Sequence, residues 1–205
     1  CGQRTLAGFK YSAIPIVAAV SGFALGGGCE LALHCTAIQA HAECKMGLVE
    51  ARVGLVPAWG GCKEMLSRFV VFGQHSDIER PPNWLAFELI ARSATSSSAF
   101  DARQLGYLRP SDGLTMNRAR LLKDAHSRAI REMEGYERPK VIEIALPTLP
   151  SVSKDPTDVH AKLRLIFASS GEALSEHILL QREKSAFLEL VTSASTIEKV
   201  RAVVR

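Results

Sequence analysis

Hydrophobic and polar positions divide the chain into an early α/β part and a later helical part. Residues 14–20 form a short apolar run rich in β-branched side chains, a pattern typical of a strand buried on both faces. Ser21 and Gly22 end this run, and residues 31–38 favour a helix. We therefore predict a strand, a glycine-containing loop and a helix within an α/β portion that covers residues 1–72.

Beyond residue 72 the apolar positions recur at helical spacing, so this part is predicted to be helical throughout. The sequence S-A-F-D at residues 98–101 has the form of a capping box, and Gly106 is placed to end the helix that follows. Arg109 to Gly113 has the composition of a turn. Further helices are expected over residues 116–133, 161–191 and 196–204, the last opened by a second capping box at residues 195–198.

Four prolines between residues 139 and 158 predict an extended connector between these helices. The expected organisation is therefore consecutive along the chain. It comprises the second half of an α/β core at residues 1–72, a helical region at 73–138, the connector at 139–158 and a helical tail at 159–205.

Three consecutive glycines precede the first predicted helix, and Glu30 follows them in its first turn. A residue without a Cβ lets a ligand approach the backbone closely. The start of a helix also presents amide N–H groups without intrahelical acceptors, together with partial positive charge. The N–H of Gly27 is therefore a candidate donor to a developing oxyanion, an interaction worth about 3 kcal/mol in known sites.

Glu50 lies in a second glycine-containing loop and is a candidate partner for Glu30. Two carboxylates in unlike surroundings can divide acid and base work between them. Taken singly, Glu30 is explained by its favourable interaction with the helix dipole, and Glu50 by solvation in a loop. Their joint occurrence with the glycine run and a P-A-W-G-G sequence at residues 57–61 favours an active site.

At these positions the chain resembles the crotonase superfamily of enoyl-CoA hydratases and isomerases. The family pattern A-x-x-G-x-A-x-G-G-G-x-E corresponds to residues 19–30, and the G-x-x-E and G-x-x-P-x-x-G-G patterns fall within residues 47–61. Residues 86–91, 98–125 and 175–190 are similar to the C-terminal part of a bacterial multifunctional 3-hydroxyacyl-CoA dehydrogenase. The resemblance implies an α/β fold, a partial ClpP/crotonase spiral core followed by C-terminal helices.

The resemblance also implies roles for individual residues. Gly27 would supply one of two oxyanion donors, Glu50 would donate a proton to the α-carbon, and Glu30 would activate water. The residues expected to line the substrate are Leu25, Gly26 and Trp59. Core packing is an equally good interpretation of Trp59, and a buried structural role is a better one than catalysis or metal binding for His34.

The implied reaction is the hydration of trans-2-enoyl-CoA to 3-hydroxyacyl-CoA in fatty-acid β-oxidation. Two alternatives remain open: double-bond isomerisation, which needs one carboxylate, and a non-catalytic docking or oligomerisation module that uses the helices beyond Pro139. In the family, the second oxyanion donor and much of the CoA-binding surface precede the buried strand. We therefore expect the chain to be the later part of a longer polypeptide and a poor enzyme alone.

The composition and net charge of the chain indicate which ligands and partners are compatible with it. The net charge of +4 is compatible with an anionic ligand such as CoA, and no dense basic stripe indicates nucleic acid. Five cysteines without a C-x-x-C spacing indicate neither a disulfide framework nor a zinc site, as expected in a reducing cytoplasm. No apolar run is long enough to span a bilayer.

No cofactor is expected in this segment beyond the CoA thioester that serves as substrate. A G-x-G-x-x-G fingerprint after a strand is missing, so NAD would belong to a separate domain of a longer enzyme. The expected assembly is a homo-oligomer or part of a multifunctional polypeptide, with no nucleic-acid partner and no membrane insertion.

Overall fold

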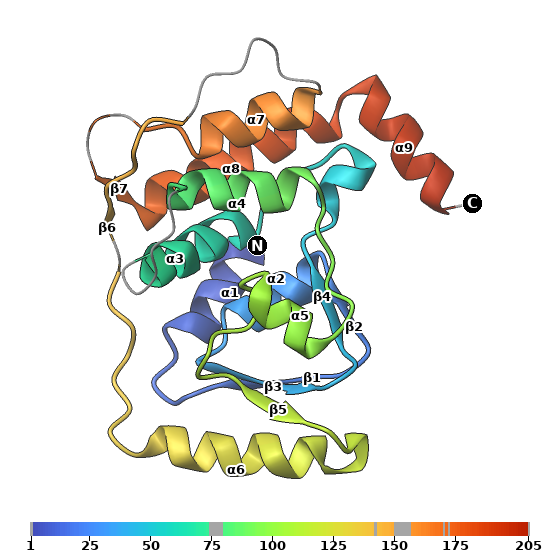
Figure 1. The fold of residues 1–205 in the computed structure, drawn as a ribbon. Coiled ribbons are helices and arrows are strands. Elements are labelled where there is room, and N and C mark those ends of the chain that lie inside the picture. The colour runs from blue at the N-terminus through green and yellow to red at the C-terminus, as the bar shows by residue number, and fades with distance from the viewer. Residues whose placement is uncertain are drawn as a thin grey trace. The chain divides into compact units, whose positions relative to one another are not determined.

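The computed structural model describes residues 2–73, 80–141, 143–149, 157–169, 171 and 173–204, which fall into two compact units (Figure 1). Unit 1 consists of Cys1–Gly47 and Thr95–Lys140, and unit 2 of Leu48–Ala94 and Val141–Arg205. Each unit thus combines an early and a late segment, whereas the sequence pattern suggested consecutive regions. The difference arises because segments far apart in the chain pair with one another inside each unit.

Unit 1 is built on two small parallel sheets. The first has the strand order β1-β3-β5, with β1 at Val17–Val20, β3 at Ala37–His41 and β5 at Gly113–Thr115. The second pairs β2 at Phe23–Leu25 with β4 at Lys45–Gly47, so that Leu25 lies beside Gly47. The helices and helical turns of this unit are α1 (Gly2–Lys10), α2 (Gly27–Leu33), α5 (Ala99–Gln104), η2 (Arg118–Arg120) and α6 (Leu121–Met133).

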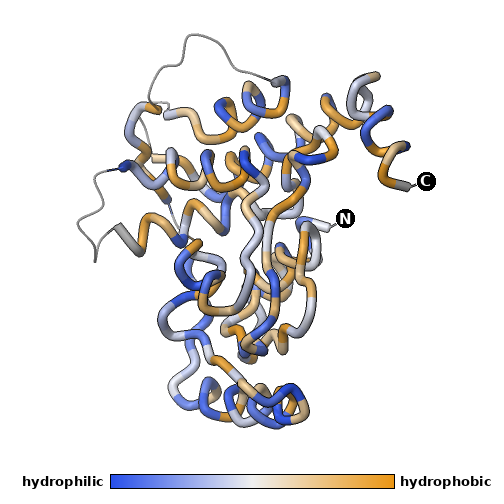
Figure 2. Tube along the Cα trace, turned by 45° about the vertical axis from the view of Figure 1, so that its right-hand side comes forward, coloured by the Kyte–Doolittle hydropathy of each residue, from blue (hydrophilic) through white to orange (hydrophobic). Residues whose placement is uncertain are grey.

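The core of unit 1 lies around β3, whose five residues are all buried. Helix α6 packs against β1 and β3. Hydrophilic and hydrophobic residues alternate along α6, and Leu122 and Met133 are exposed (Figure 2). The turn predicted at Arg109–Gly113 is confirmed: the Asp112 amide donates to the Arg109 carbonyl at 3.0 Å, and the Asp112 carboxylate accepts the amide of Ile38 at 2.9 Å.

Two predictions for the early part are wrong in extent. The strand begins at Val17 rather than Ile14, and Ile14 is 63% exposed, so the run is not buried on both faces. The helix predicted over residues 31–38 ends at Leu33, because β3 begins at Ala37 and pairs with strands on both sides. Burial and pairing of this segment outweigh its weak preference for helix.

Unit 2 is mainly helical. Its elements are η1 (Glu50–Val53), α3 (Gly61–Gly73), α4 (Pro82–Ala91), β6 (Glu143–Ile144), α7 (Asp158–Ile166), β7 (Leu174–Ser175), α8 (Glu176–Val191) and α9 (Ala194–Val204). Strands β6 and β7 pair antiparallel, α3 packs against α4 and α8, and α9 packs against α8 and η1.

The expectation that everything after residue 72 is helical is wrong, because β5, β6 and β7 lie there. The single helix predicted over residues 161–191 is two helices, α7 and α8, and Gly171 between them has φ of 81°. Helix α9 is capped by Ser193, whose hydroxyl accepts the Thr196 amide at 3.3 Å, and not by Ser195. The predicted connector contains β6, and its residues 142 and 150–156 lie outside the described residues.

The predicted start and end of α5 are confirmed. The Ser98 hydroxyl accepts the amide of Asp101 at 3.2 Å, and Gly106 adopts φ of 84° just beyond the helix. The Asp101 carboxylate accepts the amide of Ser97 at 2.7 Å, one residue before the cap. Across the described residues, every helix is too short or too polar to traverse a bilayer.

Candidate active site

The turn between β2 and α2 in unit 1 fixes the backbone of the glycine run. Gly26 has φ of 54° and ψ of −127°, a conformation that a residue with a Cβ rarely adopts. Its amide donates to the Gly47 carbonyl at 2.8 Å, which continues the β2–β4 pairing by one residue. The amides of Gly27 and Gly28 follow at the first helical positions, where no intrahelical acceptor exists. The turn therefore offers fixed N–H donors at the start of a helix.

Glu30 lies in the first turn of α2, as predicted, and is 3% exposed. Its amide donates to the Gly26 carbonyl at 2.9 Å, so the same glycine orients both the donors and the carboxylate-bearing residue. The ring Nδ1 of buried His34 donates to the Glu30 carbonyl at 2.7 Å. This contact gives buried His34 a structural role at the end of α2.

The backbone at Gly28 is open on its Cβ side. A Cβ added at Gly28 would meet no atom within 4 Å, and Gly28 is exposed. Leu25 and Gly27 are half-buried, whereas the next residue, Cys29, is fully buried. The start of α2 therefore exposes Gly28 at the surface of unit 1 while Cys29 packs in the core.

Glu50 belongs to unit 2, where it opens the 3-10 helix η1 rather than lying in an irregular loop. It is half-buried, and its carbonyl accepts the amide of Leu55 at 3.0 Å. Gly54 ends η1 with φ of 83°, and Arg52 Nη2 donates to the Ser93 carbonyl at 3.2 Å. Glu50 thus occupies a short, defined element.

Trp59 lies on the segment that joins η1 to α3 and is 49% exposed. At this exposure Trp59 is not a core-packing residue of unit 2. The residue that follows, Gly60, is buried with φ of 110°. A tight turn therefore places Trp59 at the surface of unit 2 directly before α3.

A buried charged cluster at the start of α3 was not predicted. Lys63 is 2% exposed and contacts Glu64 and, at 3.1 Å, Glu176 of α8. Burial lowers the pKa of the Lys63 ammonium, but the charges of Glu64 and Glu176 more than offset this effect and hold the pKa above its ordinary value of 10.5. Lys63 is therefore charged at neutral pH.

Glu183 is a second acidic residue of α8 that sequence reasoning missed. It is fully buried, and its two carboxylate oxygens accept the amides of Gly60 and Lys63, each at 2.8 Å. One signal could have revealed it: Leu179, Glu183, Ala186 and Leu190 are the buried stripe of α8, so an acid stands where the pattern calls for an apolar residue. An acid at such a position usually has a buried partner.

The structure brings Leu25, Gly26, Gly27 and Glu30 together on one turn of unit 1. Glu50 and Trp59 lie nine residues apart in unit 2. Within the described ranges, no group of three or more His, Cys, Asp or Glu side chains could hold a metal ion. The chemistry available to these residues is hydrogen bonding from amides and proton transfer by carboxylates.

Comparison with known proteins bears on this arrangement. Residues 3–75 match the model of the enoyl-CoA hydratase/isomerase family. The structure resembles the crystal structure of carnitinyl-CoA hydratase from Mycobacterium avium, with a TM-score of 0.61, 25% identity, and coverage of 97% of this chain and 63% of that one. The chain belongs to the crotonase superfamily. Its α/β fold is a partial crotonase fold with C-terminal helices, as the resemblance implied.

Two longer relatives are similar to this chain over nearly its whole length. A protein of Bacillus subtilis, provisionally named 3-hydroxyacyl-CoA dehydrogenase, is 34% identical over 95% of this chain and 27% of its own length. A protein of Rickettsia prowazekii, provisionally named fatty acid oxidation complex trifunctional enzyme, is 33% identical over 99% of this chain and 28% of its own length. The chain thus spans little more than a quarter of either relative.

Proposed function

We propose that the chain contributes to the hydration of trans-2-enoyl-CoA to 3-hydroxyacyl-CoA in fatty-acid β-oxidation, as part of a longer enzyme. One observation carries the proposal: a single glycine with positive φ, Gly26, orients both the Gly27 amide at the start of α2 and the buried Glu30 in its first turn. Membership of the hydratase/isomerase family and the longer relatives support the choice of substrate and pathway.

The proposed chemistry uses three groups. The Gly27 N–H donates to the thioester oxygen and stabilises the negative charge that develops when the carbonyl becomes enolate-like. Glu30 accepts a proton from water as the water oxygen bonds to the β-carbon, and Glu50 delivers a proton to the α-carbon. The product gains the elements of water across the former double bond. Trp59, half-exposed beside Gly60, would contact the acyl chain.

The proposed mechanism requires Glu50 to approach the turn that carries Gly27 and Glu30. We also propose that the chain acts in a homo-oligomer or as part of a multifunctional polypeptide. We propose that the enzyme works in the cytoplasm, where the four cysteines described here, all buried and reduced, need no disulfide partner. The CoA thioester is the proposed substrate, no dissociable cofactor is assigned to this segment, and any NAD would act in a separate domain. The trifunctional name of the Rickettsia prowazekii relative and the dehydrogenase name of the Bacillus subtilis relative support this wider context.

Isomerisation is the second candidate, because shifting a double bond requires one carboxylate and Glu50 lies in a defined, half-buried element. The test is an assay of the full-length enzyme with crotonyl-CoA and with a 3-enoyl-CoA. Hydration requires rapid loss of crotonyl-CoA absorbance with formation of the 3-hydroxy product. Conversion of the 3-enoyl substrate without turnover of crotonyl-CoA would replace hydratase by isomerase. Turnover of neither would reject both activities.

A further inference from the structure

The segment that carries Glu50 is held at two points by the C-terminal helices of unit 2. This segment, residues 50–60, comprises η1 and the loop with Trp59. Helix α9 packs against η1, and α8 contacts α3 where the segment ends. The contacts at the two points, Gly54 and Gly60, are hydrogen bonds with side chains more than 120 residues later in the chain.

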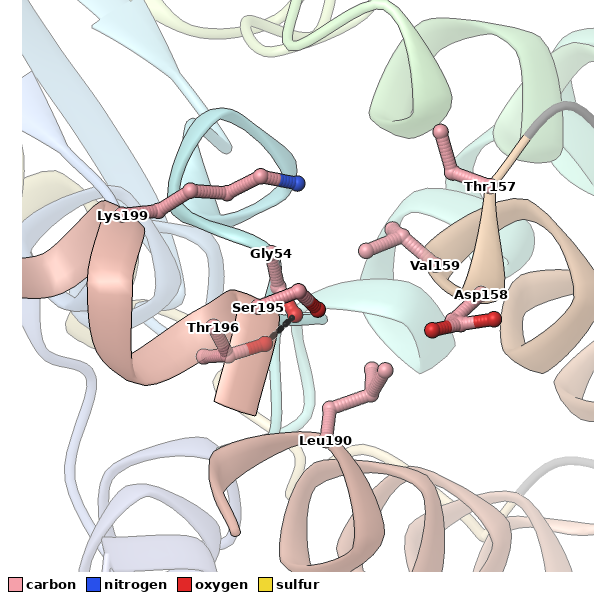
Figure 3. A pocket seen from close by; sticks show the side chains of 8 residues that line it. All are labelled: Gly54, Thr157, Asp158, Val159, Leu190, Ser195, Thr196 and Lys199. Atoms are coloured by element: carbon pink, nitrogen blue, oxygen red, sulfur yellow. Dashed lines mark hydrogen bonds between the residues drawn. The ribbon is translucent and has the colours of Figure 1, made fainter. Parts of the chain in front are cut away.

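Thr196 of α9 holds the first point, Gly54. Its hydroxyl donates to the carbonyl of Gly54 at 2.9 Å, the contact drawn as a dashed line in Figure 3. The Thr196 oxygen in turn accepts the hydroxyl of Ser193 at 2.9 Å. Thr196 is 2% exposed, and a Cβ at Gly54 would lie 2.7 Å from its oxygen. The left-handed residue that closes η1 is therefore packed directly against α9.

The contact borders a pocket of about 250 Å³, which is also lined by Asp158, Leu190 and Lys199 (Figure 3). Thr196 and Gly54 lie on one wall, so the hydroxyl contributes to a buried contact at the edge of the pocket and not to its open centre. A bond in this position is shielded from competition with water. It is correspondingly effective as a restraint on the Gly54 backbone.

Glu183 of α8 holds the second point, Gly60. Its carboxylate spans the amides of Gly60 and Lys63, which are among the first donors of α3 without intrahelical acceptors. The negative charge also complements the helix dipole of α3. Because Glu183 is fully buried and both its oxygens accept amides, the position of Gly60 is defined from α8.

We propose that Thr196 and Glu183 are positioning residues that fix the segment bearing Glu50. Helices α8 and α9 would then influence the rate of the reaction through Glu50 and would not serve only for docking. The proposal rests on the proposed function of Glu50 as proton donor. A catalytic carboxylate must be held close to its productive geometry, and a displacement of 1 Å can reduce the rate about 100-fold. Restraint at Gly54, directly after η1, and at Gly60 would supply this precision to an element of four residues.

The experiment compares Thr196→Val, Thr196→Ser and Glu183→Gln in the full-length enzyme. Thr192→Val and Glu189→Gln are matched controls on α8: the Thr192 hydroxyl donates to carbonyls of its own helix, and the Glu189 side chain is 60% exposed. Hydrogen–deuterium exchange of peptides covering residues 50–63 and the kinetics of crotonyl-CoA hydration are measured for each. Melting temperature shows which variants fold.

We expect Thr196→Val and Glu183→Gln to increase exchange over residues 50–63 at least about tenfold and to lower kcat about 10-fold to 100-fold, with KM changed far less. Thr196→Ser restores both values, and the controls match wild type. Thr196→Val keeps the side-chain volume, so it decides the proposal if Glu183→Gln does not fold.

The proposal is overturned if exchange over residues 50–63 equals that of the controls, or if exchange rises while kcat is unchanged. It is also overturned if Thr196→Ser fails to restore kcat, because the effect would then not depend on the hydroxyl. If wild-type enzyme hydrates nothing, the proposed function fails separately. In that case the exchange measurement alone supports or overturns the restraint of the segment.

Discussion

The turn that carries Glu30 and the segment that carries Glu50 are held in different ways. In unit 1, Gly26 is fixed by its own backbone conformation and by one bond to Gly47 of the adjacent strand. In unit 2, the segment from Glu50 to Gly60 is fixed by side chains 142 and 123 residues away from their partners. A local sequence pattern is enough to predict the first arrangement, whereas the second depends on the tertiary fold.

The charges of the two regions differ as well. The turn in unit 1 relies on backbone dipoles, and Glu30 is the acid in its first helical turn. The corresponding part of unit 2 buries Lys63 with Glu64, Glu176 and Glu183 at the junction of α3 and α8. Removing one charge from such a group leaves the others uncompensated, so unit 2 is expected to be the more sensitive to substitution.

Lys63→Met is expected to give the largest loss of stability. It leaves the buried carboxylates of Glu64 and Glu176 without their cation, at a cost of about 3–5 kcal/mol in the free energy of unfolding measured with urea. Lys162→Met removes a partner of the exposed Glu189 and serves as control, with a loss below about 1 kcal/mol. Equal losses for the two variants would show that burial of the Lys63 cluster does not increase its contribution to the free energy of unfolding.

Gly26→Ala is expected to have the next largest effect, this time in unit 1. The φ and ψ angles of Gly26 are strained for alanine, which predicts a loss of about 1–3 kcal/mol in the free energy of unfolding. Gly28→Ala is the matched control, because a Cβ there meets nothing within 4 Å, and we expect it to leave stability nearly unchanged. If urea unfolding ranks the two variants the other way, Gly26 does not fix the turn.

A smaller effect is expected from Cys44, which is buried in unit 1 between β3 and β4. Burial raises the pKa of its thiol from 9.0 to about 11. The unfolded chain therefore loses this proton first, so the contribution of Cys44 to stability is complete below pH 9 and is lost as pH rises to about 11. The limiting slope is about 1.4 kcal/mol per pH unit.

The measurement is urea unfolding of wild type and Cys44→Ala at pH values from 8 to 11. Subtracting the free energy of unfolding of Cys44→Ala from that of wild type cancels the contribution of other groups that titrate in the same pH range. The free energy of unfolding of wild type minus that of Cys44→Ala should be constant below pH 9 and should fall as the pH rises from 9 to about 11. A difference that stays constant up to pH 11 would mean that the folded and unfolded thiols titrate alike.

Much of unit 1 could be predicted from sequence because its signals are local. The glycine run fixes the start of α2, Ser98 caps α5, and Gly106 ends it, each through contacts with residues nearby in the chain. The predicted helix over residues 31–38 ran into the first two residues of β3, because the structure of this strand is determined by its pairing with β1 and β5.

The structure of unit 2 depends on contacts that no local pattern contains. The break between α7 and α8 depends on a short strand, β7, which pairs with β6 thirty residues earlier. Glu183 and Thr196 are ordinary helix residues until their partners, Gly60 and Gly54, are known. The acid within the apolar stripe of α8 is the one sequence signal of this arrangement.

The most direct test of the account is the hydration of crotonyl-CoA by full-length enzyme carrying Glu30→Gln or Glu50→Gln. Glu43→Gln and Glu189→Gln, which alter exposed glutamates in units 1 and 2, are the controls. General acid–base catalysis by both carboxylates predicts that each of the first two substitutions lowers kcat at least about 100-fold while the controls retain wild-type rates. Folded Glu30→Gln and Glu50→Gln enzymes with kcat within about tenfold of wild type would contradict the proposed roles.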